Sequence, residues 1–274
     1  FAGCGGLSLG LHNSGWKGAF AIEKSEDAFK TLEHNLIKKK KHFDWPNWLD
    51  QKHHDINQVL ENHSKNLIAL RGKIDLVAGG PPCQGFSMAG RRVENDSRND
   101  LINSYIKFID LVQPKLIFFE NVKGFTQGFK NNNKKGRAYS VYVKEELEKK
   151  GYTVQGHLIN FADYGVPQKR TRFILVGIQN EYVENNANLN KETFFERIEK
   201  NKKDFLVGKN LTVNPTLENA ISDLLQSKGQ IASETPNFKA GIYGNRESEY
   251  QTYLRKYKKQ DSKVDSHRFA KHTE

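Results

Sequence analysis

Short apolar runs alternate along the chain with longer segments in which apolar residues recur every three or four positions. The runs predict buried strands at residues 19–23, 73–78, 116–120, 152–158 and 173–176. The longer segments predict helices at residues 25–37, 56–70, 99–113 and 138–150. Ser25 is a suitable cap for the first helix, and Pro114 and Gly151 are placed to end the last two. This alternation predicts an α/β fold with a doubly wound, mostly parallel sheet.

Beyond about residue 180 the pattern weakens, and residues 216–225 and 249–259 are the best helical candidates among polar residues. Hydrophobic residues make up 36% of the chain and aromatic residues 11%, a composition typical of a globular protein. No run approaches the roughly 18 apolar residues that a membrane-spanning helix requires, so we expect no membrane association. The chain starts at Phe1 without a methionine or a signal segment, which indicates a piece of a longer protein.

The net charge indicates which kind of binding partner to expect, and the cysteine content indicates the cellular compartment. The formal charge of +11 favours a polyanionic partner, with nucleic acid first. Two cysteines, Cys4 and Cys83, do not make the disulfide framework of a secreted domain, so a reducing, cytoplasmic setting is expected. His53 and His54 lack a second cluster of ligands nearby, and we therefore expect no metal site.

Cys83 follows the strand predicted at residues 73–78 and stands on a stiffened backbone. Pro81 and Pro82 precede it, and their rings restrict the chain, while two glycines before them allow a sharp turn. A thiol held at the carboxyl end of a strand is placed like a nucleophile. An isolated cysteine is more often a small buried apolar residue, so the other motifs must decide between the two interpretations.

The glycine-rich opening would let backbone amides and a helix N-terminus approach a polar cofactor group. Its spacing, with Gly3, Gly5 and Gly6, is not G-x-G-x-x-G, and such a turn alone is a weak signal. Glu23 stands about 20 residues after the turn, where an acid can bind ribose hydroxyls. A cofactor that carries a nucleoside is therefore favoured, with nicotinamide and S-adenosylmethionine both open.

Glu120 and a basic pair supply further candidate chemistry. A carboxylate at the end of an apolar strand needs a task or a partner, although capping the next turn would be enough. Arg170 and Arg172 would point to one face of an extended chain and could grip a phosphate or a carboxylate, or form a solvated basic turn. Glu120 and Cys83, at the ends of two parallel strands, could act on one substrate.

Four motifs, taken in order, resemble those of DNA cytosine-5 methyltransferases. They are FAGCGG at residues 1–6, PPCQ at 81–84, ENV at 120–122 and QKRTR at 168–172. The resemblance is strong up to about residue 177 and fainter at 212–224 and 248–267. It implies the Rossmann-like sheet of S-adenosylmethionine-dependent methyltransferases, double-stranded DNA as the partner and a bacterial restriction-modification system. It also implies that the chain lacks the family's first strand, its target-recognition region and its final motif.

The resemblance assigns a role to each predicted catalytic residue. Cys83 would attack C6 of a flipped cytosine, so that C5 becomes nucleophilic enough to accept a methyl group. Glu120 would hydrogen-bond N3 of the base, and Asn121 would support the Cys83 loop. Arg170 would help to hold the base, and Arg172 would lie near the phosphate backbone.

The resemblance also implies binding residues and a division of the chain. S-adenosylmethionine would contact Phe1, Gly3, Gly5, Leu7, Glu23, Asp55, Ile56, Gly80, Pro81 and Leu101. DNA would contact Gln84, Ser87, Arg91, Arg92 and Arg98, on a loop that closes over the flipped base. Residues 1–180 would form the catalytic, cofactor-binding domain. Residues 181–274 would form a polar extension of helices and loops that leads toward the target-recognition region.

Other functions compete with a DNA methyltransferase. An RNA cytosine-5 methyltransferase and a non-catalytic nucleic-acid-binding fragment are the two alternatives. An NAD-dependent oxidoreductase would explain the glycines and Glu23, but it would leave the PPCQ and ENV motifs without a role. We expect a monomer, with a cognate restriction endonuclease that acts on the same DNA site without binding this protein directly.

Overall fold

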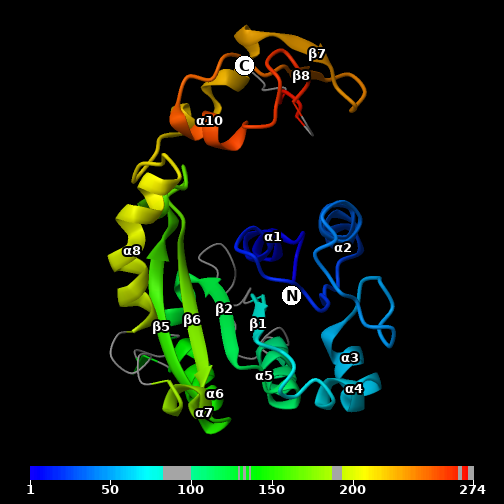
Figure 1. The fold of residues 1–274 in the computed structure, drawn as a ribbon, viewed down its shortest axis with the longest axis vertical. Coiled ribbons are helices and arrows are strands. Elements are labelled where there is room, and N and C mark those ends of the chain that lie inside the picture. The colour runs from blue at the N-terminus through cyan, green and yellow to red at the C-terminus, as the bar shows by residue number, and fades with distance from the viewer. Residues whose placement is uncertain are drawn as a thin grey trace. The chain divides into compact units, whose positions relative to one another are not determined.

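The computed structural model describes residues 1–82, 100–128, 130–131, 134–135, 137–186, 193–264 and 267–270 (Figure 1). The chain forms two compact units. The first comprises Phe1–Ile159 and Arg172–Phe195, and the second comprises Asn160–Thr171 and Glu196–Glu274. Residues 160–171 therefore pack with the second unit. The functional division predicted near residue 180 stays a prediction.

A four-stranded sheet in the order β1-β2-β6-β5 organises the first unit. Its strands are β1 (Leu76–Gly79), β2 (Leu116–Val122), β5 (Tyr152–Asn160) and β6 (Thr171–Gln179). β1 pairs with β2 in parallel, whereas β2 pairs with β6 in antiparallel orientation, so the sheet is mixed. Ile117 and Phe119 of β2 are fully buried and Phe118 between them is only partly buried, as the alternation of side chains along a strand requires. The predicted α/β fold class is confirmed.

The described part of the first unit also contains helices. They are α1 (Gly6–Asn13), α2 (Glu26–Leu32), α3 (Ile56–Asn62), α4 (Ser64–Ile68), α5 (Asp100–Val112), α6 (Tyr139–Lys149) and α7 (Asn180–Glu184). Those that contribute to the buried clusters beside the sheet are α3, α4, α5 and α6. Tyr105 and Ile109 of α5 pack with α6 and the sheet in one buried cluster. Phe108 and Val112 of the same helix pack with α3 and α4 in a second cluster. Because α5 contributes to both clusters, it holds α3 and α4 against the sheet.

Most elements with strong periodicity are confirmed. The helices predicted at 99–113 and 138–150 are α5 and α6, and the strands predicted at 116–120, 152–158 and 173–176 are β2, β5 and β6. The strand predicted at 73–78 is β1, which begins three residues later. Gly151 follows the last turn of α6 with φ 87°, as a helix-ending glycine does. The Ser25 hydroxyl accepts a hydrogen bond from the Ala28 amide and caps α2, as predicted.

The prediction of a strand at residues 19–23 is wrong. The Ile22 carbonyl accepts from the Ala2 amide at 3.1 Å, and the Glu23 carbonyl accepts from the His54 amide at 2.7 Å. These bonds go to two different segments, whereas a strand needs a continuous ladder with one neighbour. Within the described ranges no segment supplies that ladder to residues 19–23.

Two predicted helices differ in detail. Residues 56–70 form α3 and α4 instead of one helix, because His63 leaves the helical region with φ −125° and ψ 20°. Asn62, His63 and Ser64 are weak helix formers, so little opposes this break. The helix that starts after Ser25 ends as α2 and continues as a π-helix at Glu33–Lys39. The loop predicted after β2 contains a 3₁₀ turn, Lys123–Thr126, and the short paired strands β3 (Lys130–Asn131) and β4 (Lys134–Lys135).

The second unit is built from short elements. They are the larger part of α8 (Phe194–Gly208), α9 (Leu217–Ile221), α10 (Glu249–Leu254), β7 (Gln230–Ala232), β8 (Lys239–Gly241) and 3₁₀ turns at Phe161–Tyr164, Ser222–Leu224 and Gln226–Lys228. α9 and α10 lie inside the helices predicted at 216–225 and 249–259 but are shorter. Thr216 and Asn219 form a capping box at the start of α9.

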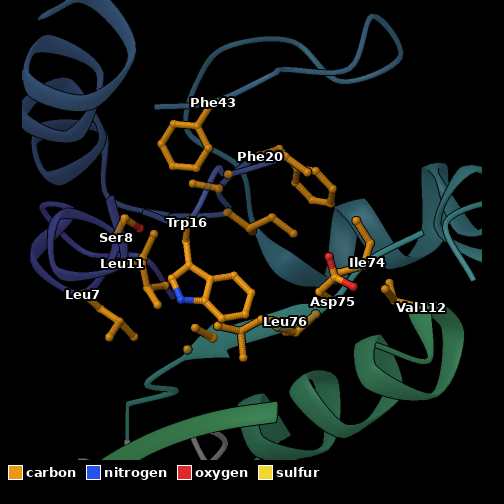
Figure 2. A pocket seen from close by; sticks show the side chains of 18 of the residues that line it. Leu7, Ser8, Leu11, Trp16, Phe20, Phe43, Ile74, Asp75, Leu76 and Val112 are labelled. Carbon is orange, nitrogen blue, oxygen red and sulfur yellow. The ribbon is translucent and has the colours of Figure 1, made fainter. Parts of the chain in front are cut away.

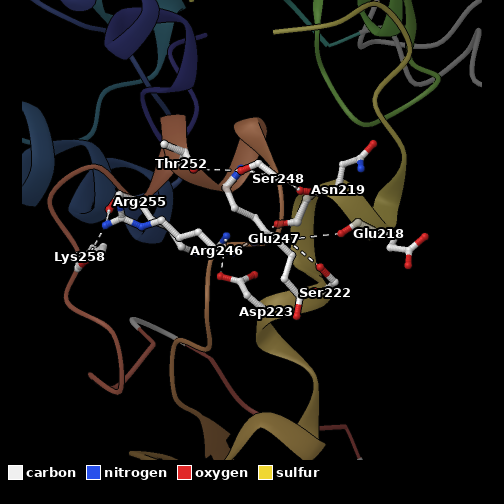
Figure 3. Close-up of polar contacts among 12 residues, drawn as sticks. Glu218, Asn219, Ser222, Asp223, Arg246, Glu247, Ser248, Thr252, Arg255 and Lys258 are labelled. Carbon is white, nitrogen blue, oxygen red and sulfur yellow. Dashed lines mark hydrogen bonds and ion pairs between the residues drawn. The ribbon is translucent and has the colours of Figure 1, made fainter. Parts of the chain in front are cut away.

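A buried polar network joins α9 and α10 (Figure 3). Asp223 is 0% exposed, and its Oδ2 lies 2.8 Å from Nη1 of Arg255. The Gln251 side chain is also fully buried; its Nε2 donates to the Ser222 hydroxyl at 2.8 Å, and its Oε1 accepts from the Glu247 amide at 2.6 Å. Gln251 is hydrogen-bonded, as a buried polar group must be to be stable, whereas Oδ1 of Asp223 has no hydrogen-bond partner in the described part of the chain. The ion pair of Asp223 with Arg255 and the bonds of Gln251 together hold these segments against one another.

Two features are absent from the described part of the chain. No helix in it is long and apolar enough to cross a membrane. No three of its His, Cys, Asp and Glu side chains are grouped so that they could hold a metal ion.

Candidate active site

A glycine-rich turn at residues 3–5 leads into α1. Gly3 has φ 56°, and Gly5, the N-cap of α1, has φ 88°, which lies in the left-handed region that favours glycine. A Cβ atom at Gly5 would lie 2.7 Å from Cδ1 of Leu36. Both the backbone conformation and the close packing therefore favour glycine at position 5.

The carboxylate of Glu23 is fixed beside this turn. Its Oε2 accepts from the Gly3 amide at 2.8 Å, and its Oε1 accepts from the Ser25 amide at 2.9 Å. An ionised carboxylate offers about four acceptor positions, so about two remain for a ligand. The structure thus brings Gly3 and Glu23 together, while their role in binding a cofactor stays a prediction.

Asp55 is joined to the same region, because the amide of its neighbour His54 donates to the Glu23 carbonyl at 2.7 Å. Asp55 caps α3 through Oδ1, which accepts from the Asn57 amide at 2.8 Å, and its Oδ2 lies 2.8 Å from Nζ of Lys24. The hydrogen bond from Lys24 lowers the pKa of Asp55, with help from Asn57 and against the effect of partial burial. Lys24 was not predicted as a site residue; its position directly after Glu23 is the signal that the sequence offers.

The ends of β1 and β2 bring a second group together. These strands pair in parallel, with Gly79 opposite Phe119, so Gly80 comes next to Glu120. A Cβ atom at Gly80 would lie 2.9 Å from Oε2 of Glu120. The buried Asn121 side chain donates from Nδ2 to the Pro81 carbonyl at 3.1 Å, and its Oδ1 accepts from the Val122 amide at 2.9 Å. Asn121 therefore ties the chain after β1 to the end of β2.

Glu120 forms an ion pair with Arg172 across the antiparallel pair β2 and β6. The Nε atom of Arg172 lies 2.9 Å from Oε1 of Glu120, and the two side chains are 16% and 35% exposed, respectively. Val122 is the register partner of Arg172, and Glu120 stands two residues before Val122, so all three share one face of the sheet. The pair orients the carboxylate while a third of Glu120 stays open to a ligand.

The other predicted residues lie in varied surroundings. Ile56 is buried at the start of α3, Leu101 is half-buried on α5, Phe1 is half-buried and Leu7 is exposed on α1. Arg170 belongs to the second unit, where its side chain is exposed and its carbonyl accepts from the Phe161 amide at 3.0 Å. Its predicted role in holding the base stays a prediction.

The predicted nucleophile and the predicted DNA contacts lie outside the described residues. They are Cys83, Gln84, Ser87, Arg91, Arg92 and Arg98. Their roles stay predictions.

Replacing Gly80 with alanine should lower kcat/KM of the complete protein by about 10- to 100-fold without unfolding it. The new Cβ would crowd Oε2 of Glu120, and misplacing a positioning group by even a fraction of an ångström is costly in catalysis. Steady-state kinetics and a melting curve test this expectation. Gly10→Ala is the matched control, because a Cβ on that helical residue meets open space. Unchanged kinetics for Gly80→Ala would contradict the expected crowding.

Polar side chains therefore meet where the parallel strands β1 and β2 end, in the same unit as the glycine-rich turn. In open α/β sheets, ligands bind outside the carboxyl ends of the strands. The fold and these residues together define a ligand-binding α/β protein of the Rossmann-like type.

The chain belongs to the C-5 cytosine-specific DNA methylase family, whose model matches residues 1–273, so the resemblance drawn from the four motifs is confirmed. It is 37% identical over 183 residues to Type II methyltransferase M.XorII of Xanthomonas oryzae pv. oryzae, covering 65% of this chain and 39% of the relative. It is 36% identical over 180 residues to Type II methyltransferase M1.HphI of Haemophilus parahaemolyticus, covering 65% and 44%.

A solved structure is similar over the same share of the chain. It is described as a candidate DNA modification methyltransferase encoded within an E. coli prophage, and it matches with a TM-score of 0.51 and 26% identity. The match covers 66% of this chain and 46% of that one. The chain thus spans less than half the length of these relatives.

Proposed function

We propose that the complete protein transfers a methyl group from S-adenosylmethionine to C5 of cytosine in double-stranded DNA. The observation that carries this proposal is the arrangement of polar side chains at the end of β2. Arg172 orients the carboxylate of Glu120, and the side chain of Asn121 donates to the Pro81 carbonyl, two residues before Cys83. Family membership and the net charge of +11 support DNA as the substrate. The Type II names of the relatives support a bacterial restriction-modification role, with an endonuclease acting on the same site. We further expect a cytoplasmic monomer.

The residues around the glycine-rich turn fit S-adenosylmethionine. Gly3 carries no side chain, and the space where its Cβ atom would lie is open, so the backbone there can approach a ligand closely. Glu23 keeps acceptor positions for ribose hydroxyls, and the ionised Asp55 can accept a hydrogen bond from the adenine amino group. When bound there, S-adenosylmethionine would supply an electrophilic methyl group.

Cys83 supplies the nucleophile in this proposal. Its thiolate forms a bond with C6 of a cytosine turned out of the duplex, and electron density rises at C5. Glu120 shares a proton with N3 while charge develops on the ring and keeps that proton when the ring is restored. After C5 has gained its methyl group, loss of the C5 proton to water expels Cys83 and regenerates the thiolate.

Methyl transfer from labelled S-adenosylmethionine to duplex DNA and to transfer RNA tests the proposal on the complete protein. We expect label at C5 of cytosine in DNA. Glu120→Gln should lower kcat/KM by about 10²- to 10³-fold with little change in cofactor affinity, since the lost proton acts on the ring. The matched control is Glu61→Gln, an exposed acid on α3. Methyl transfer to RNA alone would overturn the proposal in favour of an RNA cytosine-5 methyltransferase. DNA binding without methyl transfer would overturn it in favour of a non-catalytic nucleic-acid-binding protein.

A further inference from the structure

A cavity of about 420 Å³ beside β1 in the first unit is not suited to the phosphate backbone of DNA (Figure 2). Apolar side chains dominate its lining, and its two lysines, Lys17 and Lys73, are matched there by two acids, Asp44 and Asp75. Nζ of Lys17 lies 3.1 Å from Oδ1 of Asp44, so part of the positive charge is already neutralised. Phosphate binding outside the candidate active site therefore requires cations on the surface.

A short basic loop follows α10 in the second unit. It comprises residues 256–260, with the sequence Lys-Tyr-Lys-Lys-Gln, and every one of these residues is exposed. The loop carries three lysines and no acid. Lys256 and Lys259 form no ion pair with any residue that the structure describes. A polyanion is the complementary partner of such a surface.

Hydrogen bonds fix the backbone of the basic loop at both ends (Figure 3). Nη2 of Arg246 donates to the Arg255 carbonyl at 2.7 Å and to the Lys258 carbonyl at 3.0 Å. At the other end, the Ser262 hydroxyl donates to the Lys259 carbonyl at 2.6 Å. Because the backbone is already ordered, the loop loses less conformational entropy when it meets a ligand.

Lysines that follow a helix can serve the helix itself, because cations stabilise its carbonyl end. At the end of α10 other donors already do this. The Arg255 carbonyl accepts from Nη2 of Arg246 and from the Lys258 amide at 3.0 Å. The ammonium groups of Lys256 and Lys259 are therefore not required at this helix end.

Tyr257 adds an aromatic ring to the basic loop. It is 88% exposed, the highest value among the large apolar and aromatic residues in the described ranges. Nζ of Lys256 lies 5.6 Å from the centre of its ring. A tyrosine hydroxyl can donate to a phosphate oxygen, and the ring offers apolar area that a partner can bury.

We propose that the basic loop binds the sugar-phosphate backbone of duplex DNA, with Lys256 and Lys259 on phosphates and Tyr257 beside them. This inference rests on the proposed function, which supplies duplex DNA as the polyanion. On each strand one phosphate recurs about every 3.4 Å along the helix axis, so neighbouring lysines can face more than one phosphate. Backbone contacts position a protein and carry no sequence information, so the loop should strengthen binding to DNA of any sequence.

Acetylation of surface lysines with acetic anhydride, followed by mass spectrometry, tests the contact on the complete protein. The probes are two duplexes of unrelated sequence, each of about 30 base pairs. With either duplex at about ten times its Kd, acetylation of Lys256 and Lys259 should slow by about fivefold to tenfold. Lys203, an exposed residue of α8 in the same unit, is the internal control and should react at an unchanged rate.

Variants that remove one charge each measure the number of phosphate contacts. Lys256→Gln and Lys259→Gln should each reduce the slope of log K against log salt concentration by about 1, and the double variant by about 2. Affinity at about 0.1 M salt should fall about three- to tenfold per lysine, by the same factor on both duplexes. Lys203→Gln removes an equal charge and is the matched control. Tyr257→Phe should weaken binding less than Tyr257→Ala, because it keeps the ring.

Each contrary outcome has a definite meaning. Unchanged acetylation with DNA, or an unchanged salt slope in the double variant, would overturn the basic loop as a DNA contact. Equal weakening by Lys203→Gln would overturn it in favour of overall charge. Protection by transfer RNA and not by duplex DNA would overturn DNA as the partner of the loop. Methyl transfer to DNA by the unaltered complete protein is measured separately, so the loop can fail while the proposed function holds.

Discussion

Replacing Cys83 with serine in the complete protein is expected to lower the rate of methyl transfer by a factor of about 10⁴ or more. Serine nearly preserves size, but its hydroxyl ionises far less readily than a thiol at neutral pH, and the thiolate is the attacking species. Without the bond to C6, C5 of cytosine stays a poor nucleophile. Single-turnover methylation and covalent trapping on DNA that contains 5-fluorocytosine measure the two expected losses.

The second cysteine provides the matched control for this experiment. Cys4 is exposed, and Cys4→Ser should keep covalent trapping. Cys83→Ser should still bind DNA and S-adenosylmethionine, because the proposed contacts for both lie on other residues. A covalent complex that survives in Cys83→Ala would contradict the proposed mechanism.

The strongest sequence predictions are those that rest on local signals. The strand β2 and the helices α5 and α6 have clear periodicity, and Pro114 and Gly151 mark the ends of the two helices. Each signal lies within the element that it predicts, so no knowledge of distant partners was needed.

Predictions failed where a distant partner decides the outcome. Residues 19–23 have the composition of a strand, but a strand exists only with a continuous neighbour, and the backbone of these residues bonds instead to two separate segments, at Phe1 and Ala2 and at His54. The segment at 160–171 lies between two strands of the sheet, yet it packs with the second unit. Neither the partners of residues 19–23 nor the packing of residues 160–171 can be predicted from the residues of the segment itself.

The candidate site shows the same division. The sequence indicated Glu120 and Arg172 separately, each from the residue type and its position at a strand end. Their contact at 2.9 Å depends on the antiparallel register of β2 and β6, which joins residues 52 positions apart. The close approach of Gly80 to Glu120 likewise follows from the parallel register of β1 and β2. The sequence shows that Gly80 has no side chain. Only the strand register shows that the carboxylate of Glu120 occupies the space where a side chain at position 80 would lie.

Replacing Arg255 with methionine is expected to destabilise the second unit by about 3–5 kcal/mol, because it leaves the buried Asp223 without its ionic partner. Arg255 also donates to the Ala220 carbonyl at 3.3 Å and lies over the Tyr243 ring at 5.2 Å, so packing is lost as well. Hydrogen exchange at residues 217–225 measures the loss of stability. Tryptophan fluorescence monitors the first unit in the same samples, since all three tryptophans lie there.

The loss of stability in Arg255→Met should also depend on pH in a definite direction. Burial raises the pKa of Asp223, and Arg255 opposes that rise. Without Arg255 the pKa in the folded state should rise further, and a carboxyl whose folded pKa is raised loses stability as pH increases through that pKa. The variant should therefore lose more stability at about pH 7 than at about pH 5.

Two further variants test whether the loss of stability in Arg255→Met comes from the unpaired charge of Asp223. Removing both charges, in Asp223→Leu with Arg255→Met, should cost less than Arg255→Met alone, because no buried charge is left unpaired. Lys256→Ala, at the exposed neighbouring position, should change stability by no more than about 0.5 kcal/mol. A loss below about 1 kcal/mol for Arg255→Met, or equal losses at both pH values, would mean that Asp223 does not depend on Arg255 for its charge. The polar network would then be held by Gln251 and its partners instead.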